Sequence, residues 1–192
     1  MKKNILYFSK AGPTNTGETL REALERANEL GIKDIVIATA YGDTALKASR
    51  IFDPKKFNLV AVTLSEGFMK SEKIELRDEA ISKMKEVDIK VLTGTHSLGQ
   101  NVNSAFTDKF GGKSLDGVVK ETLYRFCQGM KVCVEIVLMA ADVGLIPINR
   151  EVIAIAGTER GADTAIVVKP AYPRTFLDFK ILEIIAKPRE PT

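Results

Sequence analysis

Short apolar runs of strand length alternate with stretches of helical period along most of the chain, and this alternation constrains the fold more than any other feature. Residues 34–39 (DIVIAT) form a run that is apolar enough to be buried on both faces of a sheet. Thr16–Leu30 has apolar residues three or four positions apart and is followed by Gly31, which is typical of an amphipathic helix and its stop. Strands that alternate with helices predict an α/β fold with three layers (α/β/α), in which helices cover both faces of a mostly parallel sheet.

The other elements are predicted from the same patterns. Further strands are expected at residues 5–8, 59–64, 89–93, 152–156 and 165–169, and the last two form an antiparallel hairpin at the edge of the sheet. Further helices are expected at residues 43–52, 72–85, 115–126, 130–144 and 175–186. The polar, glycine-rich residues 94–114 are longer than an ordinary connection, which indicates a functional or mobile loop.

Length, charge and cysteine content narrow the class of protein. The 192 residues predict one domain over residues 1–192, because chains usually divide only beyond about 250 residues. The net charge of +3 gives no reason to expect a nucleic acid or a membrane as a partner. The two cysteines, Cys127 and Cys133, are expected to be buried and reduced, which suits a cytoplasmic protein. With His96 as the one histidine and no CxxC pair, no metal site is expected.

Glycine, threonine and serine recur directly after the predicted strands. Ligands of such sheets bind beyond the carboxyl ends of the strands, and glycine amides and hydroxyl groups together can hold a phosphate or a similar anionic group. The segments are residues 9–17, 39–45, 63–67, 93–99 and 157–164. The candidate binding residues are Asn15, Thr16, Thr39, Tyr41, Gly42, Asp43, Thr44, Thr63, Thr93, Gly94, Thr95, His96, Gly157, Thr158, Arg160, Gly161, Ala162, Asp163 and Thr164. Of these, Thr44 and Asp163 are expected at solvent-accessible turns, so that replacing both by alanine weakens ligand binding and leaves the fold cooperative.

Each segment also has a purely structural interpretation. Gly42, Asp43 and Thr44 can simply begin a helix, His96 can be a structural or surface residue, and Arg160 can be a solvated side chain. Catalytic motifs are missing: residues 111–114 (GGKS) lack the first glycine of a phosphate-binding P-loop, and there is no GxSxG nucleophile motif. The residues alone therefore assign no catalytic group.

Several segments resemble known families. Residues 35–45 (IVIATAYGDTA) and 152–169 resemble a strand with its helix start and the final hairpin of the C-terminal domain of pyruvate kinase. Residues 93–98 (TGTHSL), 128–135 (QGMKVCVE) and 157–165 (GTERGADTA) resemble a stand-alone family of small, mostly archaeal proteins with this fold. This resemblance implies a pyruvate kinase C-terminal-domain-like fold without the catalytic barrel, and therefore without pyruvate kinase activity. It also implies that flavin mononucleotide (FMN) binds at the carboxyl ends of the strands.

Two functions remain open after the resemblance is taken into account. The first is a binding or regulatory domain for a phosphorylated small molecule, with FMN as the specific ligand. The alternative is a flavin-dependent oxidoreductase in which His96, Tyr41 or Arg160 contacts the flavin or the substrate. An enzyme that acts on a phosphorylated metabolite is a weaker third interpretation. The apolar helix expected at residues 130–144 is compatible with a homo-oligomer or with a buried core helix.

Overall fold

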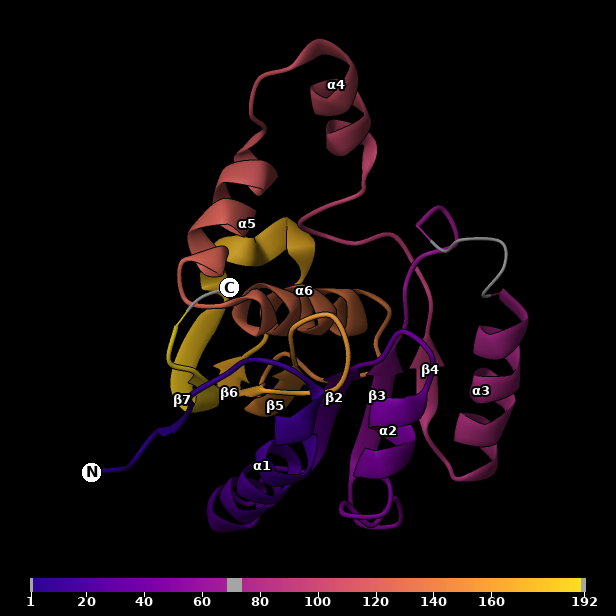
Figure 1. Ribbon diagram of the computed structural model, residues 1–192, viewed down its shortest axis with the longest axis vertical. Helices are drawn as coiled ribbons and strands as arrows, with labels where there is room; N and C mark the ends of the chain where they lie inside the picture. The colour runs from indigo at the N-terminus through magenta and orange to yellow at the C-terminus, as the bar shows by residue number, and fades with distance from the viewer. Residues whose placement is uncertain (1, 69–73, 191–192) are drawn as a thin grey trace.

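The computed structural model describes residues 2–68 and 74–190. Within this part of the chain, seven strands form a single sheet in the order β1-β7-β6-β5-β2-β3-β4 (Figure 1). The strands are β1 (Leu6–Phe8), β2 (Asp34–Ala38), β3 (Asn58–Val62), β4 (Lys90–Leu92), β5 (Val152–Ala156), β6 (Thr164–Lys169) and β7 (Lys180–Pro188). The helices are α1 (Thr16–Leu30), α2 (Asp43–Ala48), α3 (Ile74–Glu86), α4 (Val102–Phe110), α5 (Leu115–Tyr124) and α6 (Gln128–Asp142), with short 3₁₀ helices η1 (Pro13–Asn15) and η3 (Pro173–Asp178).

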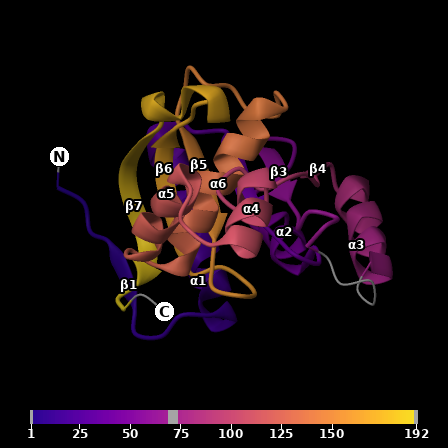
Figure 2. The same ribbon diagram turned by 90° about the horizontal axis from the view of Figure 1, so that it is seen from above.

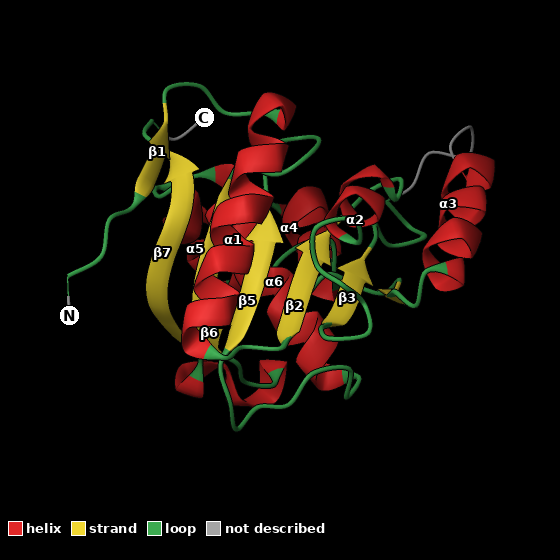
Figure 3. Ribbon diagram, turned by 90° about the horizontal axis from the view of Figure 1, so that it is seen from below, coloured by secondary structure: helices red, strands yellow, loops and turns green. Residues whose placement is uncertain are grey.

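Helices cover both faces of the sheet, as predicted. Helices α1 and α2 lie on the face that is nearest the viewer in Figure 3, and α6 lies on the other. The core on the first face includes Leu20 of α1 and Met84 of α3, whereas the core on the second is built around α6, with Met130 and Leu138. These side chains are almost completely buried, so burial of apolar surface on both faces holds the three layers together.

The sheet is mostly parallel, and this determines where a binding site can form. Strand β2 pairs in parallel with both β3 and β5, β3 pairs in parallel with β4, and β1 pairs in parallel with β7. Strand β6 runs antiparallel to its neighbours β5 and β7. The carboxyl ends of the parallel strands therefore share one edge of the sheet, and the amino end of β6 joins them there.

The predicted α/β class and mostly parallel sheet are confirmed, but the antiparallel hairpin is placed differently. The β5–β6 hairpin lies inside the sheet, because β7 continues the sheet beyond β6 and β1 continues it beyond β7. The helix expected at residues 43–52 ends earlier, at Ala48. Glu72, the expected first residue of the following helix, lies outside the described residues.

The prediction of a helix at residues 175–186 is wrong. This segment contains the end of η3 and most of β7. Ile184 packs against the core on one face of the sheet and Ile185 against the core on the other, as successive residues of a strand do. In the sequence, two adjacent isoleucines resemble part of the apolar face of a helix. In the structure they point to opposite faces of a strand, which pairs with β6 and β1.

The loop expected at residues 94–114 is also wrong in part, because α4 occupies its second half. Asn101 precedes α4, and its side chain accepts a hydrogen bond from the Ser104 amide at 3.2 Å. Gly111 follows α4 with a φ of 76°, a left-handed value that favours glycine and ends the helix. No helix in residues 2–68 and 74–190 combines the length and the apolar character needed to cross a membrane.

Candidate functional site

A cavity of about 550 Å³ lies at the edge of the sheet where the parallel strands end. The segments after β2, β3, β4 and β5 contribute to its walls, and α6 closes one side. This volume falls within the range of about 300–1,000 Å³ that is usual for small-molecule sites. The residues that line it are Ala38, Thr39, Ala40, Asp43, Thr44, Val62, Thr63, Leu64, Phe68, His96, Gln100, Tyr124, Gln128, Lys131, Val132, Glu135, Ile136, Met139, Gly157, Thr158, Glu159, Arg160 and Gly161.

About half of the predicted site residues line this cavity, and they come from four of the five segments after the strands. They are Thr39, Asp43, Thr44, Thr63, His96, Gly157, Thr158, Arg160 and Gly161. The remaining predicted residues lie outside the cavity lining: Asn15, Thr16, Tyr41, Gly42, Thr93, Gly94, Thr95, Ala162, Asp163 and Thr164. The edge of the sheet thus gathers residues that are distant in sequence, although fewer than the sequence predicted.

The segment after β1 packs against another loop and does not reach the cavity. The Thr16 hydroxyl accepts a hydrogen bond from the Ala162 amide at 3.0 Å and donates one to the Pro13 carbonyl at 2.6 Å. A Cβ atom at Gly161 would lie 2.5 Å from that hydroxyl oxygen, so the two loops approach too closely for a side chain there. The predicted binding group Thr16 is therefore used to join two loops.

Asp163 is buried and not at a solvent-accessible turn, which corrects the expectation for this residue. Its carboxylate accepts hydrogen bonds from the Gly12 amide at 2.9 Å, the Thr158 amide at 3.2 Å and the Thr164 hydroxyl at 2.8 Å. Thr44 lines the cavity but is also buried. Asp163 joins the segment after β1 to the segment after β5, so replacing it by alanine would disturb the fold as well as the site.

Two hydroxyl groups at the cavity have no hydrogen-bond partner in the described part of the chain. They are the buried Oγ1 atoms of Thr39 and Thr158, and both residues line the cavity. Thr39 as a whole is only 5% exposed. A buried hydroxyl without a partner costs free energy, so such atoms are usually satisfied by a water molecule or a ligand. Both atoms belong to residues of the cavity lining, so a ligand that reached them would satisfy them.

The sequence did not predict that α6 contributes polar residues to the cavity. Lys131 and Glu135 form an ion pair, Nζ to Oε2 2.5 Å, and both side chains are less than 10% exposed. The other Glu135 oxygen accepts a hydrogen bond from the Leu98 amide at 2.9 Å, which ties the segment after β4 to α6. The signal in the sequence was a lysine and a glutamate four residues apart in an otherwise apolar helix, the spacing that places two side chains on one face.

Arg160 lies at the mouth of the cavity with most of its side chain in solvent. It donates a hydrogen bond to the Asp43 carboxylate, Nη2 to Oδ2 3.1 Å, and its guanidinium lies 5.9 Å from the centre of the Tyr41 ring. Tyr41 thus contacts a lining residue although it does not itself line the cavity. The two cations of the lining, Lys131 and Arg160, are each paired with a carboxylate, and Glu159 adds a third carboxylate to the lining.

His96 is half-buried in the cavity wall, and its pKa lies below the ordinary value of 6.5. Burial disfavours the charged imidazolium; the Glu135 carboxylate opposes this effect, and Lys131 adds to it. His96 is therefore mainly neutral at pH 7, the form that can accept a proton. Burial likewise raises the pKa of the Tyr124 hydroxyl, with Glu135 and Glu121 adding to the shift.

The lowered pKa of His96 predicts a pH dependence of stability. The unfolded chain binds this proton more tightly than the folded chain, so the contribution of His96 to stability is present above pH 6.5 and is lost as the pH falls from 6.5 through the folded-state pKa. Urea denaturation at about pH 7.5 and about pH 5.5 should show a lower free energy of unfolding at the lower pH. The variant His96→Gln should reduce this difference; an equal difference in both proteins would contradict the assignment.

Comparison with known proteins identifies the family. A family model described as "Pyruvate kinase, alpha/beta domain" matches residues 18–168. The chain belongs to the pyruvate kinase alpha/beta domain family. The resemblance to the pyruvate kinase C-terminal domain is thereby confirmed. The family match extends from α1 into β6 and includes every residue that lines the cavity, whereas β1 and β7 lie outside it.

Two similar solved structures are pyruvate kinases from Cryptosporidium parvum, and each is 15% identical to this chain. The match to the first structure covers 80% of this chain and 22% of the enzyme's chain, with a TM-score of 0.42. The second structure is described as a complex with ADP; the match to it covers 89% of this chain and 23% of the enzyme's chain, with a TM-score of 0.38. This pyruvate kinase alpha/beta domain thus spans less than a quarter of the length of either enzyme.

Proposed function

We propose that the cavity binds a phosphorylated small molecule and that the chain acts as a binding or regulatory domain. The unpartnered Thr39 and Thr158 hydroxyls carry this proposal, because a polar ligand would satisfy both of them. Arg160 at the mouth and Lys131 in the wall supply positive charge, and a ligand phosphate would compete with Asp43 and Glu135 for them.

We propose FMN as the specific ligand in preference to a small sugar phosphate. The lining includes the apolar side chains of Val62 at the end of β3 and of Ile136 and Met139 in α6, next to the polar Lys131 and Glu135 of the same helix, and Phe68 also lines the cavity. A flat aromatic ring suits these apolar side chains, while a ribityl phosphate suits the polar side with Thr39 and Thr158. When bound, FMN would supply hydride and electron transfer; the chain would hold its ring against α6 and its phosphate beside the segment after β5.

The proposed role does not include phosphoryl transfer from phosphoenolpyruvate. The family match covers the alpha/beta domain alone. We place the protein in the cytoplasm, a location supported by the two free, buried thiols of Cys127 and Cys133.

A pair of threonine-to-valine variants tests the proposal. Thr39→Val should lower FMN affinity about tenfold, because the hydroxyl is replaced by a methyl group of similar size. The same variant should not lower stability, since the Thr39 hydroxyl makes no hydrogen bond in the described part of the chain. Fluorescence titration with FMN and urea denaturation measure the two effects.

The matched control is Thr122→Val, whose hydroxyl lies outside the cavity and donates to the Val118 carbonyl at 2.9 Å. Its FMN affinity should equal that of the unmodified chain. Absence of FMN binding by the unmodified chain would reject FMN, and titration with sugar phosphates would then test the broader proposal. Equal affinity in Thr39→Val and the unmodified chain would remove the site from this cavity.

The second candidate function is a flavin-dependent oxidoreductase, and the position of His96 favours it. His96 lines the cavity and is mainly neutral at pH 7, so it could accept a proton from a substrate that reacts at the flavin. Anaerobic addition of NADH or NADPH to the FMN-loaded protein should bleach the visible flavin band. If the band persisted with both donors, the oxidoreductase function would be rejected and the binding role would remain.

A further inference from the structure

None of residues 101–114, which include helix α4, is buried. Helix α4 stands beyond α6, away from the strands of the sheet (Figure 1), and the view from above again shows it next to α6 (Figure 2). Burial of an apolar face is what usually holds a helix in place, so a helix without it opens easily unless polar contacts hold it. The order of α4 therefore depends on the contacts at its ends.

The segment before α4 is anchored at Leu98. Its side chain is buried in the core around α6, and its amide donates a hydrogen bond to Glu135 Oε1 at 2.9 Å. A Cβ atom at the next residue, Gly99, would lie 3.7 Å from Lys131 Nζ and 3.9 Å from Glu135 Oε1. The segment thus passes directly over the ion pair of α6 that lines the cavity.

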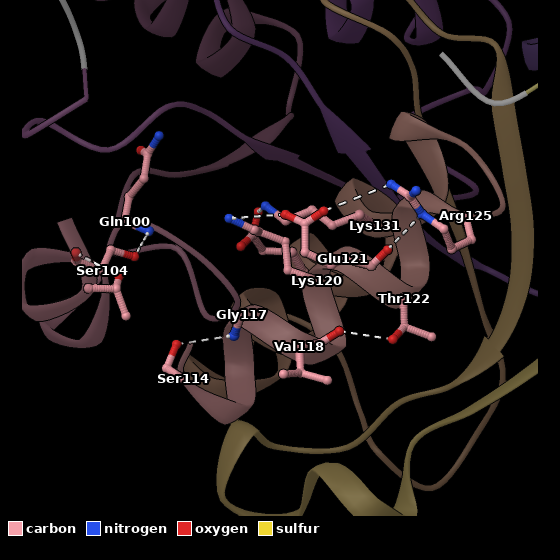
Figure 4. Close-up of polar contacts among 12 residues, drawn as sticks. Gln100, Ser104, Ser114, Gly117, Val118, Lys120, Glu121, Thr122, Arg125 and Lys131 are labelled. Atoms are coloured by element: carbon pink, nitrogen blue, oxygen red, sulfur yellow. Dashed lines mark hydrogen bonds and ion pairs between the residues drawn. The ribbon is translucent and has the colours of Figure 1, made fainter. Parts of the chain in front are cut away.

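Gln100 connects this anchor to the first turn of α4. Its amide donates a hydrogen bond to Ser104 Oγ at 2.8 Å (Figure 4), and Gln100 itself lines the cavity. Gln100 has a φ of 55°, a left-handed value that is unfavourable for a residue with a side chain. Such a conformation persists only while the surrounding contacts hold it. Loss of the anchor at Leu98 would therefore also release the first turn of α4.

The charge of Glu135 determines how strong the anchor is. Glu135 Oε2 lies 2.5 Å from Lys131 Nζ, and both side chains are less than 10% exposed. A buried carboxylate that loses its cation is unfavourable, so it takes up a proton or turns toward the cavity. Either change weakens the hydrogen bond from the Leu98 amide, because hydrogen bonds to an ionised group are about twice as strong as those between neutral groups. A group that draws Lys131 away from Glu135 thus loosens the anchor.

We infer that α4 is a ligand-responsive element, coupled to the cavity through the ion pair of Lys131 and Glu135. A ligand phosphate that binds Lys131 takes the cation from Glu135, the Leu98 amide loses its charged acceptor, and α4 loosens. This inference rests on the proposed function for the phosphate that binds in the cavity. It names α4 as the element through which a regulatory domain would report that the cavity is occupied.

Hydrogen exchange of the full chain, measured by mass spectrometry, tests the coupling without any ligand. The variant Lys131→Met removes the cation from Glu135, so the amides of residues 98–110 should exchange about tenfold faster than in the unmodified chain. Circular dichroism checks that the variant is folded. In the unmodified chain, saturation with FMN should likewise speed the exchange of residues 98–110.

Two control variants separate this effect from others. Asp163→Ala removes buried hydrogen bonds between the segments after β1 and β5, so it lowers global stability without touching the anchor. Arg160→Met removes the other cation of the cavity lining, whose partner Asp43 is about half exposed. Both variants should leave the exchange of residues 98–110 unchanged, because that exchange proceeds by local opening.

Unchanged exchange of residues 98–110 in the folded Lys131→Met variant would overturn the inference, and so would an equal increase in either control. Unchanged or slower exchange of these residues in the FMN-loaded protein would also overturn it. Failure of FMN to bind would reject the proposed ligand, and the Lys131→Met result would still decide on the coupling.

Discussion

Replacing Asp163 by alanine should lower the free energy of unfolding by about 3 kcal/mol or more. The Asp163 carboxylate is fully buried and accepts hydrogen bonds from the Gly12 and Thr158 amides and from the Thr164 hydroxyl. Alanine would leave these donors without an acceptor in the interior, and each unsatisfied group costs about 1–3 kcal/mol. Urea denaturation followed by circular dichroism measures the loss.

Asp43→Ala provides the control for this variant. The Asp43 carboxylate also contacts the segment after β5, because it forms an ion pair with Arg160. The side chains of Asp43 and Arg160 are, however, about half exposed or more. The loss should therefore stay below about 1 kcal/mol. A similar loss in Asp43→Ala and Asp163→Ala would show that the buried hydrogen bonds are not the cause.

Replacing Lys131 by methionine should also lower the free energy of unfolding by about 3 kcal/mol. The change leaves the Glu135 carboxylate buried without its cation, whereas the Leu98 amide still donates to it. The double variant Lys131→Met/Glu135→Gln removes both charges and keeps an acceptor for the Leu98 amide. It should be more stable than Lys131→Met, because no unpaired charge remains inside.

An exposed pair with the same spacing serves as the control. Lys83 and Glu79 in α3 are also four residues apart, Nζ to Oε1 2.6 Å, but more than half of each side chain is in solvent. Lys83→Met should have no measurable effect on urea denaturation. If Lys131→Met were equally silent, the ion pair in the cavity wall would not be a buried one in solution.

The sequence was sufficient for those elements whose local pattern and final environment agree. Thr16–Leu30 and Val152–Ala156 have the bounds that were expected, because each has a clear stop signal or a run that is apolar on both faces. Strand β7 could not be predicted, because its assignment depends on pairing with β6 and with the distant β1. Its adjacent isoleucines, Ile184 and Ile185, resemble a helical pattern until both faces of the sheet are known.

The candidate site was predictable only where residues follow a strand directly. Thr39 and Thr63 come directly after β2 and β3, so a parallel sheet brings them to one edge and to the cavity. Asp163 and Thr16 also lie in polar segments that follow strands, but their side chains join two loops to each other. This role depends on how closely the loops approach in space, which the sequence does not show. Lys131 and Glu135 lie on α6, and only the packing of that helix across the strand ends shows that they belong to the cavity.

The pairing of β1 with β7 has a consequence for how the chain folds. Leu6 pairs with Ala186, so β1 finds its neighbour only after the residues between them and β7 itself have been synthesised. Until then, β1 is an unpaired edge with a free row of amides and carbonyls, while the sheet from β2 to β6 can assemble around α6. Such a long sequence separation slows the final step, and a stalled or shortened nascent chain would expose β6 in place of the finished edge.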